Sequence, residues 1–371
     1  MDERQTTPAP VYFVNDTQLD DGISDIESSV PSDFTDDSMS TLASEEAIEY
    51  FQQLNGRMFP KDENMPIAIP TDAAEFKRLM LQHIQLKIFL GANYVGPVRE
   101  ILSPSMDGGE KKVLDLITAE GSWQVSLIQE MAKEFPHAHF TTVDNIPLFP
   151  HTQLPNVAFE VYDLYNGIAE RADTFDLVHL RHAAMHLKNP KALIREIYRV
   201  LRPGGMFLFG NWELSAYDAT DPSRPAFERL PGLTKALQMT RTALTHQGVD
   251  VQMCINMPRW LEPSSELWTT PEDPSSGLMF TEPMLGFRDI VYAPMLVPIG
   301  LWPAETRLQD VGKIGANGWT HIWRSMQAPF QVFGLSKEQA QAVVDAAIRD
   351  VYSPEVHVSV KYHVTYAFKR G

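Results

Sequence analysis

Residues 112–123 read KVLDLITAEGSW, and the pattern of this stretch indicates the fold class. Its first six residues, 112–117, form a short apolar run of the length expected for a buried strand. Residues 122–135 then carry apolar side chains at helical spacing along one face. A buried strand, a short loop and an amphipathic helix in succession are typical of the first unit of an alternating α/β fold.

The same alternation continues along the chain. Further strands are predicted at residues 139–144, 157–163, 175–181 and 206–210. Between the last two strands, Asn189 and Pro190 supply the N-cap and first residue of a helix, which ends at the Pro203-Gly204-Gly205 turn. Strands that alternate with helices of about 10 to 15 residues predict a mostly parallel sheet with helices on both faces.

Two helices are predicted ahead of the sheet. The first spans about Ser44 to Gly56. The second follows a proline-bounded linker and repeats Phe76, Met80, Ile84 and Ile88 at i, i+4 spacing. We expect this apolar face to pack on the sheet that follows.

Behind the fifth strand the pattern loosens, and residues 214–285 are predicted to form a cap insertion. Residues 257–302 are rich in Met and aromatic side chains, which suit either the lid of an apolar substrate pocket or the core of an α/β cap. Helices are predicted near residues 319–330 and 336–351. A pattern of alternating hydrophobicity at residues 356–369 predicts a final strand.

The acidic residues are concentrated at the N-terminus, and the chain is predicted to have three regions. The net charge is −17, but residues 1–50 hold 13 acidic residues against one Arg, leaving 35 acidic and 30 basic residues elsewhere. Residues 1–44 are too polar to bury a core, so we expect a disordered acidic tail. Residues 45–110 are predicted as a helical lead-in, and residues 111–371 as the α/β domain.

Composition also excludes several classes of protein. No block of Lys and Arg interleaved with aromatic residues follows residue 50, so nucleic-acid binding is not expected. The single Cys254 excludes an internal disulfide and a Cys-cluster metal site, and it fits a reducing compartment. No apolar run reaches the roughly 18 residues of a membrane span. We expect a cytoplasmic protein, with the nucleus as the alternative location.

Acidic side chains end two of the predicted strands. In an open parallel sheet, ligands bind beyond the carboxyl ends of the strands. Asp144 ends the second strand, 23 residues after Gly121, where a carboxylate can accept both hydroxyls of a ribose. Asp163 ends the third strand, within reach of an adenine amino group. Two acids in register with the first-strand loop favour a nucleoside site.

A family resemblance follows from these motifs. The succession VLDL, FDLVHLR and YRVLRPGG resembles the class I S-adenosylmethionine-dependent methyltransferases, in particular the fungal branch related to the velvet-complex secondary-metabolism methyltransferase. The resemblance covers about residues 65–370. It implies a Rossmann-like sheet of seven strands, mostly parallel with the last antiparallel, and S-adenosyl-L-methionine as cofactor. The cofactor-binding residues that it implies are Asp115, Ala119, Gly121, Asp144, Asp163 and Arg181.

The first-strand loop departs from the pattern of this family. Its relatives carry three glycines at the positions of Ile117, Ala119 and Gly121. Glycine tolerates positive φ there and lets the backbone pass close under the ligand, whereas Ile117 is β-branched and poorly suited to that conformation. Glu120 adds a negative charge. The loop is either rebuilt around these residues or the cofactor site is weakened or lost.

Three side chains are candidate catalytic groups. His182 and His186 follow the fourth strand and face the ligand crevice, where a His of near-neutral pKa can act as base. Glu213 follows the fifth strand and is a comparable candidate. The alternative for each is a structural role at a strand end or on a helix surface.

Two functions from different classes fit the sequence. The first is S-adenosylmethionine-dependent methyl transfer to a small, apolar or aromatic metabolite. The second is a catalytically silent, methyltransferase-like regulator that binds a protein partner or forms a homodimer. A nicotinamide-dependent oxidoreductase is disfavoured because the chain lacks GxGxxG.

Overall fold

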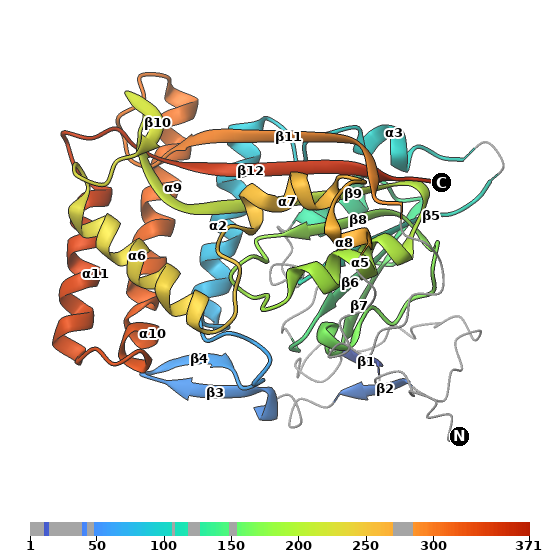
Figure 1. Cartoon of the computed structure of the whole chain (residues 1–371), viewed down its shortest axis with the longest axis horizontal. Coiled ribbons are helices and arrows are strands. Elements are labelled where there is room, and N and C mark those ends of the chain that lie inside the picture. The colour runs from blue at the N-terminus through green and yellow to red at the C-terminus, as the bar shows by residue number, and fades with distance from the viewer. Residues whose placement is uncertain are drawn as a thin grey trace, which may run out of the picture.

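The computed structural model describes residues 11–14, 39–42, 48–105, 108–117, 127–147, 154–269 and 285–371. Seven strands form the body of its central sheet (Figure 1). In spatial order they are β7 (Val157–Val161), β6 (Ala138–Asp144), β5 (Lys111–Leu116), β8 (Phe175–Arg181), β9 (Leu201–Asp218), β12 (Val358–Lys369) and β11 (Phe287–Pro298). β12, the last strand in the chain, is antiparallel to both of its neighbours. The predicted Rossmann-like sheet with an antiparallel last strand is therefore confirmed.

Helices cover both faces of this sheet. They are α2 (Ala73–Leu90), α3 (Val98–Leu102), α4 (Leu127–Glu134), α5 (Pro190–Val200), α6 (Pro231–His246), α7 (Met253–Leu261), α8 (Glu266–Thr269), α9 (Thr306–Ser325), α10 (Gln327–Val332) and α11 (Lys337–Val351), with a 3-10 turn η2 (Leu164–Asn166) after β7. Side chains alternate across each strand. Val113 therefore packs in the core under α2, α4, α6 and α9, whereas its neighbour Leu114 packs in the core under α5 and α7.

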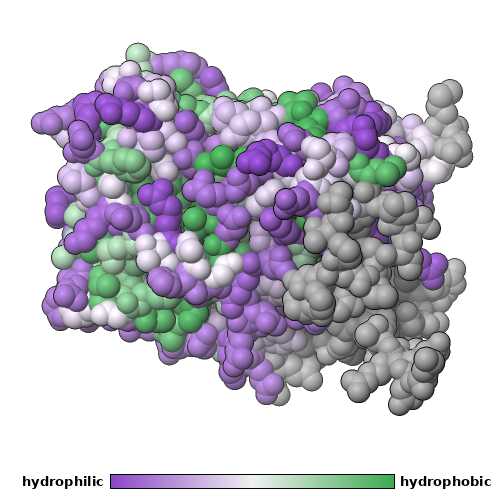
Figure 2. Space-filling model, in the orientation of Figure 1, coloured by the Kyte–Doolittle hydropathy of each residue, from purple (hydrophilic) through white to green (hydrophobic). Residues whose placement is uncertain are grey.

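Apolar side chains lie mainly in these two cores. On the face shown in Figure 2, hydrophilic residues cover most of the surface, and hydrophobic residues form small separate groups. Within the described residues, no helix is both long enough and apolar enough to cross a membrane.

A β-hairpin replaces the first predicted helix. Residues 44–56 were expected to be helical, but the described part forms a short 3-10 turn η1 (Ile48–Tyr50) and then β3 (Phe51–Leu54), which pairs with β4 (Arg57–Pro60). Asn55 and Gly56 both have positive φ, of 50° and 78°. Asn-Gly is the preferred pair for a two-residue hairpin turn, and this local signal prevailed over the apparent helical pattern.

The predicted acidic tail lies largely outside the described residues. Two four-residue strands are described within it, β1 (Val11–Val14) and β2 (Met39–Leu42), which the prediction did not include. β1 pairs antiparallel with β7, and β2 continues the sheet beyond it.

Several predicted boundaries shift along the rest of the chain. The strand expected at residues 206–210 runs from Leu201 to Asp218, so the predicted insertion at 214–285 begins inside a strand, and β10 (Asp221–Pro225) pairs back on it. The helix expected near residues 319–330 instead begins at Thr306 and ends at Ser325. The capping box at Ser336 is present as predicted.

Helix α2 forms as predicted but buries a different face. Of its four expected core residues, Phe76 is buried, and Met80, Ile84 and Ile88 are only partly buried. The buried face carries the polar residues Glu75, Arg78, His83 and Gln85. The reason is that α2 packs along α9 and also faces the strand ends, so it is covered from two sides.

Asp72 fixes the start of α2. Its carboxylate accepts a hydrogen bond from the backbone N–H of Glu75 and pairs with both Nε and Nη2 of Arg57, whose Nη1 donates to Ser325 Oγ at 2.8 Å. We expect Asp72→Ala to lower the free energy of unfolding by about 2–3 kcal/mol, because a cap and a bidentate partner of Arg57 are lost together. Urea unfolding measures this loss. Ser336→Ala, which removes only a cap from α11, is the control at about 1 kcal/mol; equal losses would show that the Arg57 contact contributes nothing.

Candidate active site

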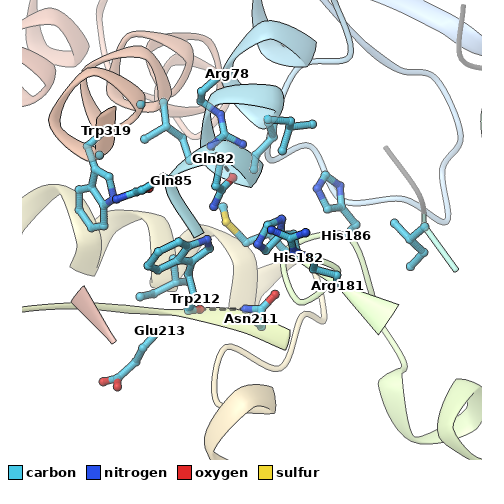
Figure 3. Close-up of a pocket in the computed structure, with 18 of the residues that line it drawn as sticks. Arg78, Gln82, Gln85, Arg181, His182, His186, Asn211, Trp212, Glu213 and Trp319 are labelled. Carbon is cyan, nitrogen blue, oxygen red and sulfur yellow. Dashed lines mark hydrogen bonds between the residues drawn. The ribbon is translucent and has the colours of Figure 1, made fainter. Parts of the chain in front are cut away.

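A mostly apolar pocket lies at the carboxyl ends of β5 and β8 (Figure 3). The strand side contributes Asp115, Ile117, His179, Arg181, His182, Met185, His186, Asn211 and Trp212. The opposite wall comes from α2, α6 and α9. The crevice therefore forms where the sheet topology predicted it, and helices distant in sequence enclose it.

A short contact between two buried side chains anchors the strand side of the pocket. Asp115 and His179 face each other across β5 and β8, with His179 Nδ1 at 2.6 Å from Asp115 Oδ1. Asp115 is 5% exposed and His179 is 4% exposed. His179 was missed in the sequence, although a polar residue inside the otherwise buried run FDLVHLR was a signal for it.

The first position of the loop adopts the conformation that glycine favours. Ile117 has φ of 55°, its side chain is buried, and its N–H donates to Val143 O at 2.8 Å. The steric argument from the sequence is thus supported by the backbone, because this position does require positive φ. The conformation costs a β-branched residue about 1–3 kcal/mol and persists because the strand pairing around it holds it. Ala119, Glu120 and Gly121 lie outside the described residues.

Asp144 and Asp163 lie close together beyond the ends of β6 and β7. Asn145, next to Asp144, donates from Nδ2 to Asp163 Oδ1 at 3.2 Å. Asp163 also caps η2 by accepting from Tyr165 N at 2.9 Å, and burial raises the pKa of its carboxyl. Asp144 is 3% exposed. Neither acid is among the residues that line the pocket, where the acidic side chains are Asp115 and Glu213.

Arg181, His182 and His186 come together at the pocket, as predicted (Figure 3). Arg181 Nη1 lies 3.3 Å from Nδ1 of His83 on α2. His182 has φ of 58°, and its ring stacks near Trp212. Burial, with a smaller effect of the Arg78 charge, lowers the pKa of His186 to about 4. At neutral pH His186 is therefore uncharged and a weak base.

Glu213 also lines the pocket, but its carboxylate is held elsewhere. Figure 3 shows its side chain directed away from the histidines, because successive residues of a strand point to opposite faces and Trp212 occupies the pocket side. Its carboxylate accepts from Tyr217 OH at 2.6 Å and contacts His363 Nε2 at 2.9 Å. Its carboxylate oxygens are therefore engaged by β9 and β12, and the catalytic role of Glu213 stays a prediction.

The Met- and aromatic-rich stretch supports the core rather than a lid. Trp260, Trp268 and Phe287 pack in the core under α5 and α7. Trp302 stacks on His357. Of the two interpretations, the core is therefore the one observed for these residues, whereas Met279, Phe280 and Met284 lie outside the described residues. The aromatic residues of the pocket are instead Trp212, Trp319 and Trp323.

Residues 92–249, which include β5 through β9 and α6, match a family model described as a methyltransferase domain. The chain contains a methyltransferase domain. This match supports S-adenosyl-L-methionine as the cofactor of the domain.

Similar proteins come from fungi. The chain is 27% identical to the secondary metabolism regulator laeA of Coprinopsis cinerea over 81% of this chain and 69% of that protein. It is 28% identical to methyltransferase str3 of Strobilurus tenacellus over 62% of this chain and 80% of that protein. It is 23% identical to methyltransferase pytC of Aspergillus terreus over 88% and 89%. The resemblance to fungal secondary-metabolism methyltransferases is confirmed.

Solved methyltransferases share lower similarity with the chain. Phosphoethanolamine N-methyltransferase 2 of Haemonchus contortus, in complex with S-adenosyl-L-methionine, is 15% identical with a TM-score of 0.39, over 85% of this chain and 62% of that one. A methyltransferase from Bacillus halodurans is 14% identical with a TM-score of 0.34, over 74% and 97%.

The positive φ of Ile117 predicts that a glycine variant is more stable than an alanine variant there, the reverse of the usual order in a strand. At φ of 55°, Ala is strained and Gly is not, so Ile117→Gly should be more stable than Ile117→Ala by about 0.5–1 kcal/mol. At Val113, buried on the same strand without positive φ, Gly should instead be less stable than Ala by a similar amount. Urea unfolding of the four variants measures both differences. The same order at both positions would show that Ile117 is unstrained.

Titration of His186 predicts a dependence of stability on pH. Its folded pKa of about 4 lies below the ordinary value of about 6.5, so the unfolded chain binds a proton there that the folded chain does not. The folded state is therefore disfavoured as pH falls from about 6.5 toward 4. We expect His186→Gln to gain about 1–2 kcal/mol relative to the wild type on going from pH 7 to pH 5, measured by urea unfolding. An unchanged difference between the two proteins would mean that His186 titrates normally.

Proposed function

We propose that the protein transfers the methyl group of S-adenosyl-L-methionine to a small, apolar or aromatic metabolite. The observation that supports this most is the pocket at the strand ends of a methyltransferase domain, which is lined by three tryptophans. A pocket of this kind, mostly apolar with a few converging polar groups, suits a small molecule.

The residues at the strand ends fit the cofactor. Ile117 adopts the positive φ expected at the first glycine position, so the chain leaves β5 in a conformation that glycine would favour. In our proposal Asp144 accepts the ribose hydroxyls and Asp163 lies beside the adenine. Asp115, Ala119, Gly121 and Arg181 would contact the remainder of the molecule.

The protein's own part in the reaction would be mainly positioning. The cofactor supplies an activated methyl group, so an acceptor held in line with the breaking bond needs little further help. In our proposal the bound acceptor, packed against the helical wall, displaces water from the pocket. His182 and His186 face the acceptor, and the weak basicity of His186 suits it to orienting a hydroxyl more than to removing an unactivated proton.

A regulatory role is the second candidate. The relative from Coprinopsis cinerea is named a regulator, and the strained Ile117 marks a loop that departs from the glycine pattern. In this alternative, the domain would bind a protein partner, or a second copy of itself, without transferring a methyl group.

Calorimetric titration with S-adenosylhomocysteine separates the two candidates. We expect the wild type to bind it, and Asp144→Ala to weaken binding at least about tenfold, since a carboxylate that accepts two hydroxyls contributes charge-assisted bonds of about 1.5–3 kcal/mol each.

Asp176→Ala is the matched control. Asp176 is a buried acid at the opposite end of the sheet, where it pairs with Lys111 and Arg202. Its loss should reduce stability and leave affinity unchanged. If the wild type fails to bind at millimolar concentration, the catalytic proposal fails and the regulatory one replaces it.

A further inference from the structure

Three N–H donors in the pocket wall have no acceptor among the described residues. They are Gln85 Nε2 on α2, Trp212 Nε1 on β9 and Trp323 Nε1 on α9. Gln85 and Trp323 are each 3% exposed. Buried donors are almost always paired in native proteins, so three in one pocket require an explanation.

Glycines on α9 give this wall its shape. A Cβ at Gly315 would lie 2.3 Å from Gln85 Nε2, so only glycine lets the Gln85 amide sit against α9. One turn later, a Cβ at Gly318 would meet nothing within 4 Å, although Gly318 lines the pocket. Beside these glycines, the Trp319 and Trp323 rings are edge to face with centroids 5.9 Å apart. The wall thus carries two indole rings of α9, and no protein atom lies within 4 Å of the Cβ position at Gly318.

Three other polar side chains at this pocket are already hydrogen bonded within the protein. Gln82 Oε1 accepts from Arg78 Nη1 at 2.8 Å. Asn211 Oδ1 accepts from Ala184 N at 3.2 Å. The Thr240 hydroxyl donates to Ala236 O within its own helix. These three side chains are engaged within the protein, whereas the N–H groups of Gln85, Trp212 and Trp323 have no acceptor among the described residues, so an acceptor atom on a ligand would find unpaired donors there.

We propose that this wall is the subsite for the methyl acceptor, and that it selects flat unsaturated ring compounds carrying carbonyl or ether oxygens through the N–H groups of Gln85, Trp212 and Trp323. This inference rests on the proposed methyl transfer and specifies its substrate class. The oxygen atoms of such a ligand would accept hydrogen bonds from the unpaired N–H donors, and the tryptophan rings would pack on the ring of the ligand. A site with buried donors rejects an analogue that lacks the matching oxygen, because the donors are then left unpaired.

Two probes that differ in one oxygen test this selection. The first is 3,5-dihydroxyacetophenone, and the second is 5-ethylresorcinol, which replaces its carbonyl with a methylene group. Isothermal titration calorimetry on the full chain measures the affinity of each. We expect the ketone to bind at least about tenfold more tightly, as one or two hydrogen bonds to buried donors require.

Variants assign the preference to named side chains. Gln85→Leu should reduce it to about threefold or less, and should raise the thermal midpoint by about 2 °C because an unpaired buried donor is removed. Trp323→Phe should reduce it in the same direction. Thr240→Val is the matched control: it lies in the same wall, but its hydroxyl is already paired, so the preference should remain.

Each result decides the proposal. A tenfold preference that Gln85→Leu abolishes and Thr240→Val keeps supports it. Equal affinity for the two probes, or binding of neither at millimolar concentration, overturns it. Titration of S-adenosylhomocysteine into the same samples distinguishes failure of the acceptor inference from failure of the proposed methyl transfer. If S-adenosylhomocysteine binds while the probes do not, the acceptor inference fails and the proposed methyl transfer stands.

Discussion

The parallel pairing of β5 with β6 on one side and β8 on the other holds the whole site in place. Because β5 is hydrogen bonded along both edges, the chain leaves the sheet at a fixed point, where Ile117 N–H bonds to Val143 O. The same pairing sets Asp115 opposite His179 at 2.6 Å. It also explains why Ile117 tolerates positive φ. Pairing with two neighbouring strands fixes the backbone, and this pairing offsets the strain of a β-branched residue in that conformation.

The two faces of β9 carry different kinds of side chain. On one face Trp212 lines the pocket, while on the other Glu213 joins Tyr217 and His363 in a buried hydrogen-bonded group that continues to Tyr292. A buried carboxylate of this kind is stable only with several partners, and those partners also hold the strand in register against β12. The polar group on this face therefore fixes β9 and positions Trp212 in the pocket.

The order of strands and helices could be predicted from the sequence, because hydrophobic period and capping residues act over a few neighbouring positions. FDLVHLR formed the strand at Phe175–Arg181, and Asn189 with Pro190 opened α5. The Asn55-Gly56 hairpin shows where prediction from hydrophobic period fails. There a turn of two residues outweighed an apparent helical pattern, and the turn carried the stronger physical signal.

By itself the sequence determined which residues end the strands, and thus that Asp115, Ile117 and Asp144 lie at the ligand edge of the sheet, since chain order and strand period suffice for that. Only the tertiary structure decided what encloses the pocket. Gln85 and Gly315 come from helices far apart in the chain, and no local pattern shows that α2 would bury its polar face against α9. Contacts between distant segments depend on packing in three dimensions, and the opposite wall of this site consists almost entirely of such contacts.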